Sequence, residues 1–339
     1  MSKQYAGETC VLAYSGGLDT SVAVAWLRET LGFEVVTCTG DLGATGDLEA
    51  VQRKAIASGA RKAIVQDARD IFLRYFVWPA LQAGALYEDR YPLATALGRP
   101  LLAKLLVDAA RAENARFVAH GCTGKGNDQV RFDLAVGALA PDLTVIAPMR
   151  GGMNMTRDEE IDYARKHDIP VEATKKNPYS VDMNLWGRSI EAGVLEDPWG
   201  APPRDVFQWT VDPEEAPAKP REIEIGFDEG VPVTIDGAKV ESVDLVHRLN
   251  DLAGNTASGG STWSKTAWSG SNRARSMKRR PRSSCTRLIA RSSRSSSRRS
   301  RSASRRSSVA STQSLYTTGS GSRRTTRTSP HTCGARSAS

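Results

Sequence analysis

The last 88 residues of the chain contain no aspartate and no glutamate. All 38 acidic residues lie in residues 1–251, together with 27 lysines and arginines, so this part carries a net charge of −11. The 19 basic residues that follow Asp251 give the rest a net charge of +19. The formal charge of +8 for the whole chain therefore describes neither part, and the two are best considered separately.

Long apolar runs and paired cysteines are also lacking. No apolar stretch is long enough to cross a membrane and no signal-peptide pattern occurs, so we expect a cytoplasmic location. The five cysteines show neither metal-ligand spacing nor a disulfide pattern, and no residue is assigned as a metal ligand. They are Cys10, Cys38, Cys122, Cys285 and Cys333. The first two lie in expected buried strands, where a small apolar thiol is the ordinary explanation.

Few residues between 271 and 339 could build a core. Serine and arginine fill 38 of these 69 positions, which is typical of a segment that is disordered in isolation. Its charge would bind polyanions at low salt, so we expect non-specific binding of nucleic acid. A genuine RNA- or DNA-binding tail remains an alternative. Against it, aromatic residues are scarce and regular Arg-Ser repeats are missing over most of the segment.

The first 150 residues alternate between strand-like and helical patterns. This alternation predicts an α/β fold, a parallel sheet covered on both faces. Ligands bind at the carboxyl ends of such strands. Strands are expected at 9–13, 34–38, 62–65, 115–119 and 143–147, and helices at about 18–31, 47–59, 97–113 and 128–139.

The pattern changes in the second half of the chain. Thr156 and Glu159 form a capping box that predicts one more helix. From about residue 177, proline and glycine punctuate shorter segments. Strand-like residues 222–225 and 231–235 flank a turn at 228–230. These features predict a second, α+β domain, for which a chain of 339 residues has room.

Residues 13–21 read Ala-Tyr-Ser-Gly-Gly-Leu-Asp-Thr-Ser and directly follow an apolar run. Gly16 and Gly17 allow a close approach to an anion, and the helix that begins near Leu18 points its free N–H groups at it. Asp19 suits phosphate only if a divalent cation or a substrate amine lies nearby. The pattern resembles the pyrophosphate loop of enzymes that split ATP between its α and β phosphates, and differs from the P-loop. The alternative is a tight turn without function.

Residues 120–132 read His-Gly-Cys-Thr-Gly-Lys-Gly-Asn-Asp-Gln-Val-Arg-Phe. Three glycines within six residues let the backbone fold closely around a ligand. Asp128 is suited to bind an α-ammonium group and Arg131 to bind a carboxylate, a combination that fits a zwitterionic amino acid. A glycine-rich surface loop that caps a helix is the alternative.

Two further stretches are less specific. Residues 177–198 are rich in polar groups and contain Tyr179 and Trp186, which could exclude water. Residues 87–96, Tyr-Glu-Asp-Arg-Tyr-Pro-Leu-Ala-Thr-Ala, lead into an apolar helix. A structural loop in the first case, and a turn with a helix N-cap in the second, are the alternatives.

Together these four stretches closely resemble the argininosuccinate synthase family, collinearly from about residue 9 to 254. The resemblance implies a pyrophosphate-loop nucleotide-binding domain of the adenine nucleotide alpha hydrolase-like type over residues 1–170. It further implies the start of an α+β synthetase domain over residues 171–254, left incomplete by a tail over residues 255–339. Another pyrophosphate-loop adenylating enzyme remains the alternative within this fold.

The resemblance implies a ligase of arginine biosynthesis that joins L-citrulline to L-aspartate with ATP and Mg²⁺, forming AMP and pyrophosphate through citrullyl-AMP. Members assemble as homotetramers. No general base is assigned, and catalysis would be mainly by positioning.

The family's ligand-binding residues map onto this sequence as follows. ATP would bind Ala13, Tyr14, Ser15, Gly16, Gly17, Leu18, Asp19, Thr20, Ser21, Gly40 and Gly121. Aspartate would bind Thr123, Asn127 and Asp128, and citrulline would bind Tyr91, Ala96, Asn127, Arg131, Ser180 and Ser189. Many members have a serine where this chain has Ala96, so that contact departs from the family pattern. Thr95 is a neighbouring hydroxyl on a different side of the helix.

The resemblance breaks at Asn255. The family continues Gly-Lys-His-Gly-Val-Gly-Arg-Val-Asp-Met-Val-Glu-Asn-Arg, whereas this chain continues Asn-Thr-Ala-Ser-Gly-Gly-Ser-Thr-Trp-Ser-Lys-Thr. One DNA sequence read one nucleotide apart can encode both strings. Residues 255–339 are therefore interpreted as an out-of-frame translation. The family's glutamate and tyrosine that bind citrulline from this region have no counterpart here.

Overall fold

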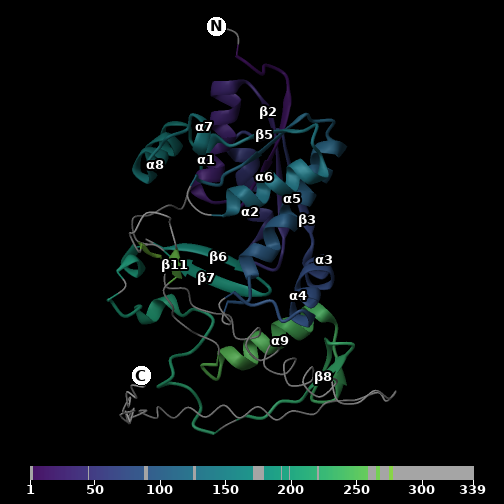
Figure 1. The fold of residues 1–339 in the computed structure, drawn as a ribbon. Coiled ribbons are helices and arrows are strands. Elements are labelled where there is room, and N and C mark those ends of the chain that lie inside the picture. The colour runs from purple at the N-terminus through teal and green to yellow at the C-terminus, as the bar shows by residue number, and fades with distance from the viewer. Residues whose placement is uncertain are drawn as a thin grey trace, which may run out of the picture.

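The computed structural model describes residues 3–44, 46–87, 91–124, 127–170, 179–191, 193–197, 199–219 and 221–258. It also describes the backbone of 265–267 and 275–277. Figure 1 shows a sheet flanked by helices in its upper part, with a hairpin, a long helix and a small sheet below. Among the described residues, no helix is long and apolar enough to span a membrane.

Five parallel strands form the central sheet, in the order β3-β2-β1-β4-β5. The strand order reverses beside β1, because β2 and β3 lie on one side of it and β4 and β5 on the other. Ala13 at the end of β1 pairs with Cys38 of β2 and with His120 of β4. The strands are β1 (Thr9–Ala13), β2 (Glu34–Asp41), β3 (Lys62–Asp67), β4 (Phe117–His120) and β5 (Thr144–Ile146).

Both faces of this sheet are covered, as the alternating pattern predicts. Side chains of successive strand residues point to opposite faces, so Cys10 and Leu12 pack in one core and Val11 in the other. The first core contains residues of α1 (Leu18–Trp26), η1 (Leu27–Leu31), α2 (Leu48–Ala57) and α8 (Arg157–Lys166). The second contains residues of α3 (Arg69–Phe72), η2 (Leu73–Val77), α4 (Trp78–Gln82), α5 (Ala94–Ala112) and α6 (Asp128–Leu139). The short α7 (Pro148–Gly151) follows β5.

Local sequence explains where several helices begin and end. The predicted capping box is present: the Thr156 N–H donates to Glu159 Oε2 at 2.7 Å, and the Glu159 N–H donates to Thr156 Oγ1 at 3.4 Å. Gly32, with φ of 89°, ends the helical run that follows β1. Helix α5 begins three residues earlier than predicted. Pro100 lies inside it and has no N–H to donate to the Ala96 carbonyl.

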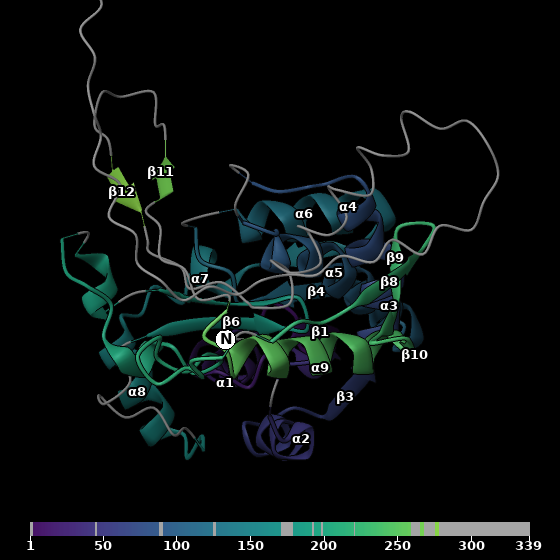
Figure 2. The same cartoon turned by 90° about the horizontal axis from the view of Figure 1, so that it is seen from below.

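The second region contains two antiparallel sheets and a helix. A hairpin pairs β6 (Ser180–Asn184) with β7 (Gly187–Glu191), and a three-stranded sheet has the order β10-β9-β8. Its elements are β8 (Ile225–Asp228), β9 (Val231–Ile235), β10 (Ala238–Lys239), α9 (Ser242–Gly254), and the 3-10 turns η3 (Gly193–Glu196) and η4 (Arg204–Val206). Figure 2, seen from below, shows α9 running across the molecule with β8, β9 and β10 at one of its ends.

Several predicted strands differ from the structure by up to three residues at an end, for example β2, which continues to Asp41 instead of ending at 38. The prediction for β8 was wrong at both ends, because β8 spans Ile225–Asp228 instead of 222–225. Glu229 and Gly230 have φ of 47° and 84°, and Asp228 pairs directly with Val231. Two residues with positive φ between paired strands are typical of a two-residue hairpin turn. Such a turn carries the pairing up to Asp228, so the strand lies later in the chain than its apolar residues alone suggest.

The two regions share one hydrophobic core. Leu185 and Trp186, at the turn of the β6–β7 hairpin, are buried with residues of η2, α4 and α5. The Trp186 ring meets the Trp78 ring edge to face, with centroids 5.8 Å apart. The Leu185 N–H donates to the Leu42 carbonyl at 2.8 Å. The hairpin is therefore held against the carboxyl end of the central sheet.

In the basic tail, β11 (Lys265–Ala267) pairs antiparallel with β12 (Arg275–Met277). The remaining residues from 259 onward lie outside the described part of the chain, so disorder of the tail stays a prediction.

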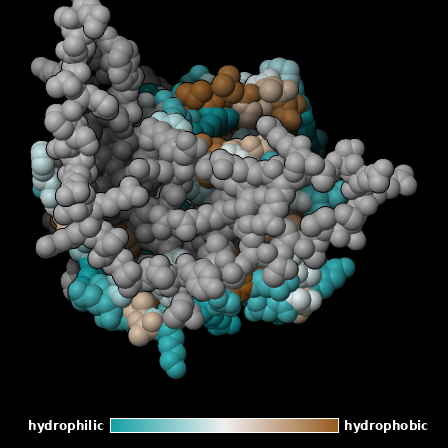
Figure 3. Space-filling model, turned by 60° about the horizontal axis from the view of Figure 1, so that its bottom comes forward, coloured by the Kyte–Doolittle hydropathy of each residue, from teal (hydrophilic) through white to brown (hydrophobic). Residues whose placement is uncertain are grey.

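On the surface in Figure 3, hydrophobic residues gather toward the upper edge. Among the described residues, three large apolar side chains of α6 are exposed: Val130, Leu134 and Leu139. Phe132 and Val136 of the same helix are buried. Helix α6 is thus apolar on both its inner and its outer side.

Gly43 provides a test of how the hairpin is held. It has φ of 83°, and a Cβ at this position would overlap the Leu185 side chain. We expect Gly43→Ala to lower the free energy of unfolding by roughly 2 to 4 kcal/mol, because backbone strain and overpacking act together. Gly46→Ala is the control, since a Cβ there meets nothing within 4 Å. Equal urea midpoints for the two variants would contradict this account.

Candidate functional site

The pyrophosphate loop is held by hydrogen bonds among its own hydroxyl groups. Ser15 Oγ lies 3.2 Å from Thr20 Oγ1 and accepts from the Gly17 N–H at 3.3 Å. Ser21 Oγ donates to the Gly17 carbonyl at 2.8 Å and lies 2.9 Å from the buried Tyr14 hydroxyl. Ser15 and Gly17 are exposed at the start of α1. The loop therefore presents hydroxyl groups and free backbone N–H groups at a helix N-terminus, an arrangement suited to anions.

Helix α2 packs against the same loop. Gly16 has φ of 77°, and a Cβ on it would lie 3.2 Å from Val51 Cγ2. Lys54 Nζ donates to the Gly16 carbonyl at 2.7 Å. The loop is thus supported from one side by an ammonium group that the motif itself does not contain.

On its other side the loop meets a buried acid. Glu160, in the first turn of α8, is 3% exposed and hydrogen-bonds Asp19. Burial, and then the charge and hydrogen bond of Asp19, raise the pKa of Glu160 to about 8. Its Oε1 atom is buried without a hydrogen-bond partner in the described part of the structure. A second carboxyl beside Asp19 was not predicted, because Glu160 is more than 140 residues away in the sequence.

Gly121 and Gly40 lie at the same edge of the sheet but in different surroundings. A Cβ at Gly121 would lie 2.9 Å from Thr20 Cγ2, so the loop after β4 closely approaches the pyrophosphate loop. At Gly40 a Cβ would lie 2.6 Å from Leu102 Cδ2 and 2.7 Å from Leu105 Cδ1 of α5. Packing against α5 is sufficient to explain Gly40, and its contact with adenosine stays a prediction.

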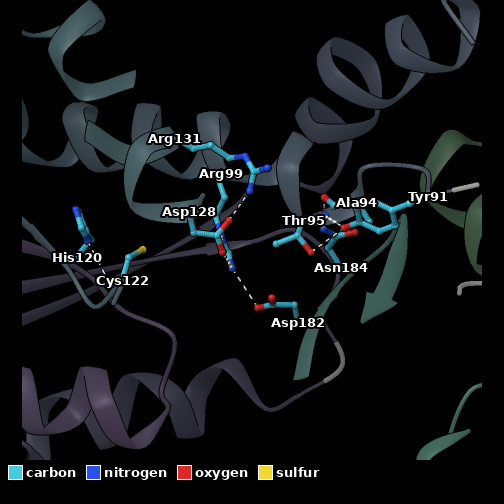
Figure 4. A network of polar contacts seen from close by, with 10 residues as sticks. All are labelled: Tyr91, Ala94, Thr95, Arg99, His120, Cys122, Asp128, Arg131, Asp182 and Asn184. Atoms are coloured by element: carbon cyan, nitrogen blue, oxygen red, sulfur yellow. Dashed lines mark hydrogen bonds and ion pairs between the residues drawn. The ribbon is translucent and has the colours of Figure 1, made fainter. Parts of the chain in front are cut away.

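His120, at the end of β4, is 1% exposed, and both of its ring nitrogens are hydrogen-bonded. Its Nδ1 accepts from the Cys122 N–H at 3.2 Å, so Nε2 carries the proton and donates to Asp133 Oδ1 at 3.0 Å. Burial lowers the pKa of His120 below 6.5, and Asp133 only partly opposes this effect. The imidazole is therefore a neutral structural group that shapes the loop after β4 (Figure 4).

Four alternating charges occupy the centre of the site. Figure 4 shows Asp128 between Arg131 and Arg99, and Arg99 extending toward Asp182. The distances are 2.6 Å for Arg131 Nη1 to Asp128 Oδ1, 3.0 Å for Arg99 Nη2 to Asp128 Oδ2, and 3.1 Å for Arg99 Nη2 to Asp182 Oδ1. Burial disfavours the Asp128 carboxylate, but Arg99 and Arg131 outweigh it and hold its pKa below the usual range. The network supplies anions and cations for zwitterionic ligands.

The β6–β7 hairpin turns one polar face toward this network. Asp182 pairs with Ser189 across the hairpin, and Ser180 lies two residues from Asp182, so all three share one face. Ser189 is buried and Ser180 is exposed. Asn184, on the same face, donates from Nδ2 to the Ala94 carbonyl at 2.9 Å. The two serines predicted to bind citrulline are thus brought to the side of the hairpin that contacts α5.

Tyr91 lies at the start of α5. Its hydroxyl donates to Thr95 Oγ1 at 3.2 Å and accepts from the Thr95 N–H at 3.1 Å. Thr95 is therefore bonded to Tyr91, and Ala96 offers no hydroxyl of its own. Figure 4 shows Tyr91 and Thr95 beside Asn184. Tyr91 and the hairpin serines therefore flank the same helix.

The predicted aspartate-binding residues lie around the start of α6. Asn127 is the N-cap residue and its carbonyl accepts from the Arg131 N–H at 3.1 Å, while Thr123 is exposed in the preceding loop. Lys125 and Gly126 of the same motif lie outside the described residues. Burial raises the pKa of the Cys122 thiol to about 11, against the effect of nearby Arg99. Arg99 thus links this loop to the charge network.

Arg99 and Asp182 are central to the network, and the sequence motifs did not identify them. Arg99 lies three residues after Ala96 on α5, and Asp182 lies two residues after Ser180 on β6. Helical and strand periodicity relative to these predicted site residues was the available signal, because positions three apart on a helix and two apart on a strand share a face.

His120 generates a prediction about acid stability. A buried histidine with a lowered pKa stabilises the fold above about pH 6.5, and that stabilisation is lost as the pH falls through the folded-state value. We expect His120→Gln to be less stable than the parent at about pH 7.5 but to lose less stability on going to about pH 5. Urea midpoints at both pH values measure this. His247→Gln, at an exposed position of α9, should follow the parent profile; a parallel profile for His120→Gln would contradict the assignment.

Two family models match the chain. The model for the arginosuccinate synthase N-terminal HUP domain matches residues 9–170, and the model for the arginosuccinate synthase C-terminal domain matches residues 179–261. An NH3-dependent NAD synthetase from Campylobacter jejuni is 16% identical, over 48% of this chain and 64% of that one, with a TM-score of 0.32. That score is too low to carry an argument.

Curated relatives agree with the family models. Argininosuccinate synthase of Symbiobacterium thermophilum is 56% identical over 250 residues, which are 74% of this chain and 62% of the relative. The Rubrobacter xylanophilus protein of the same name is 59% identical over 248 residues, 73% of this chain and 60% of the relative. The chain thus spans less than two thirds of the length of these relatives. With this site and these matches, the chain belongs to the argininosuccinate synthase family.

Proposed function

We propose that the complete protein joins L-citrulline to L-aspartate at the expense of ATP, yielding argininosuccinate, AMP and pyrophosphate in arginine biosynthesis. The observation that carries this proposal is the closeness of two sites at one sheet edge: a pyrophosphate loop after β1 and a network of alternating charges beside the loop after β4. We place the reaction in the cytoplasm.

In this proposal the residues bind and orient the substrates. The ureido oxygen of citrulline attacks the α phosphorus of ATP, the bond to pyrophosphate breaks, and the aspartate amine then displaces AMP. The pyrophosphate loop would hold the phosphates, Asp128 the aspartate ammonium, and Arg131 the citrulline carboxylate. Ser180, Ser189 and Tyr91 would hold the rest of citrulline. Fixed charges in a partly buried site stabilise developing charge without reorganisation.

Mg²⁺ belongs to this proposal as the partner of ATP. Mg²⁺ is usually held by one or two carboxylates together with substrate phosphates. Asp19 and Glu160 fit this requirement, since Glu160 Oε1 is a buried oxygen without a partner in the described residues. When bound, the ion would neutralise phosphate charge. No group of three or more potential ligand residues lies together in the described part of the chain, so we place the ion only with the nucleotide.

We further propose that residues 1–170 form the nucleotide-binding domain, that residues 171–254 begin the synthetase domain, and that residues 255–339 are out of frame. The family match ends at residue 261, seven residues after the proposed change of frame, and residues 262–339 are outside it. The tetramer and the remaining citrulline contacts are assigned to the complete protein, and the tail would bind nucleic acid only non-specifically.

Citrulline-dependent formation of AMP is the test of this function. We expect the present chain to bind ATP, with weak or absent ligation, and a chain with the reading frame restored at codon 255 to form argininosuccinate. Sequencing the DNA through this region precedes the assay. AMP formation with a different amide or carboxylate, and none with citrulline, would favour another adenylating enzyme. Tight, salt-resistant binding of one RNA sequence would favour the nucleic-acid alternative.

The proposed Mg²⁺ ligands are tested with Glu160→Gln. Glutamine keeps a hydrogen-bond donor toward Asp19 but removes the carboxylate, so ATP binding should require several-fold more Mg²⁺ while the fold is retained. Calorimetric titration with ATP across a Mg²⁺ series measures this shift. Asp162→Asn, an exposed position of the same helix, is the control. An unchanged Mg²⁺ requirement in Glu160→Gln would exclude this residue as a ligand.

A further inference from the structure

We propose that Lys54 of α2 is a phosphate-binding residue that completes the pyrophosphate loop from outside its motif. The inference rests on the proposed use of ATP and assigns the cation that faces the β and γ phosphates. Neither the motif at residues 13–21 nor the glycine-rich stretch at residues 120–132 includes this lysine.

The position of Lys54 places its charge on the loop itself. Its Nζ atom donates to the Gly16 carbonyl at 2.7 Å, and its side chain is half-buried. Gly16 lies two residues before Leu18, where α1 begins and where the N–H groups of the first helical turn point toward a ligand. An anion bound at those N–H groups is therefore a near neighbour of the Lys54 ammonium group.

The charge around the loop requires such a cation. Residues 13–21 contain no lysine or arginine and one carboxylate, Asp19. Glu160 adds a second carboxyl group on the α8 side, hydrogen-bonded to Asp19 and with its pKa raised to about 8. Backbone N–H groups and hydroxyls are neutral donors, so alone they would receive a polyanion beside the Asp19 carboxylate. Lys54 approaches from α2, which carries the opposing positive charge, and a lysine ammonium is a compact charge well suited to phosphate.

The packing of α2 explains why this lysine stays in place. Val51, one turn earlier on the helix, occupies the space beside Gly16 where a Cβ would lie. The helix begins at an N-cap formed by Asp47, which accepts from the Ala50 N–H at 3.0 Å. Lys54 is thus carried by a capped helix that contacts the loop one turn away, so the ammonium group is positioned before any nucleotide binds.

A purely structural role makes a different prediction. If Lys54 only held the Gly16 carbonyl in place, its loss would disturb the loop and weaken the binding of all nucleotides alike. If it binds phosphate, its loss weakens the binding of those ligands that carry β and γ phosphates. ATP, pyrophosphate and AMP therefore distinguish the two roles, because AMP lacks the phosphates that Lys54 would bind.

The experiment measures binding of ATP, pyrophosphate and AMP by calorimetry to the full chain and to Lys54→Met. We expect the affinity for ATP and for pyrophosphate to fall about tenfold or more, and the affinity for AMP to change by less than about twofold. Lys54→Arg should recover most of the loss, since the charge is kept. Arg53→Met is the matched control, because Arg53 is an exposed neighbour on the same helix, paired with Asp47.

An equal loss of affinity for ATP and AMP, with a lowered melting temperature, would overturn the phosphate-binding role and indicate that Lys54 only supports the loop. Unchanged ATP binding in Lys54→Met would overturn it as well. In both cases the parent chain still binds ATP and the proposed function stands. A parent chain that binds neither ATP nor pyrophosphate would overturn this inference, whereas the chain with the reading frame restored still tests the proposed function separately.

Discussion

The site depends on the pairing of β1 with β4. These strands are distant in the sequence, but their pairing places Ala13 beside His120, so that the two following loops leave the sheet next to each other. The reversal of strand order at this point keeps the space above them open to a ligand. Gly121 can approach Thr20 this closely because it has no Cβ. Nucleotide and amino-acid groups are therefore neighbours as a result of topology.

Around this pair, three helices and a hairpin each add an ionisable side chain that neither loop contains. Helix α2 contributes Lys54, α8 contributes Glu160, and α5 contributes Arg99, while the hairpin contributes Asp182. The hairpin is held by Trp186 and Leu185 in a core shared with the central sheet. Apolar packing thus sets the distances between charged groups, and the charges in turn are partly neutralised in pairs.

Local sequence signals were sufficient for the sheet, its covering helices and the two glycine-rich loops. Apolar periodicity located the five strands, and the Thr156 capping box located α8, because both depend on residues near in sequence. The bounds of β8 were missed because a two-residue turn, and not apolar content, determines where that strand lies. Glu160 was missed for a different reason. Its place beside Asp19 arises only when α8 packs against the pyrophosphate loop, which the capping box next to it does not reveal. Asp182 shares a strand face with Ser180, but its ion pair with Arg99 depends on the packing of the hairpin against α5.

Pro100 has a consequence for the main-chain polarity of its helix. A proline inside α5 leaves the Ala96 carbonyl without the backbone donor that helix geometry would provide. A main-chain acceptor without the usual backbone donor therefore lies one turn before Arg99. A substitution at residue 96 alters the side chain but cannot remove this oxygen. The main-chain polarity of the helix at that point is thus set by residue 100 and does not depend on the side chain at residue 96.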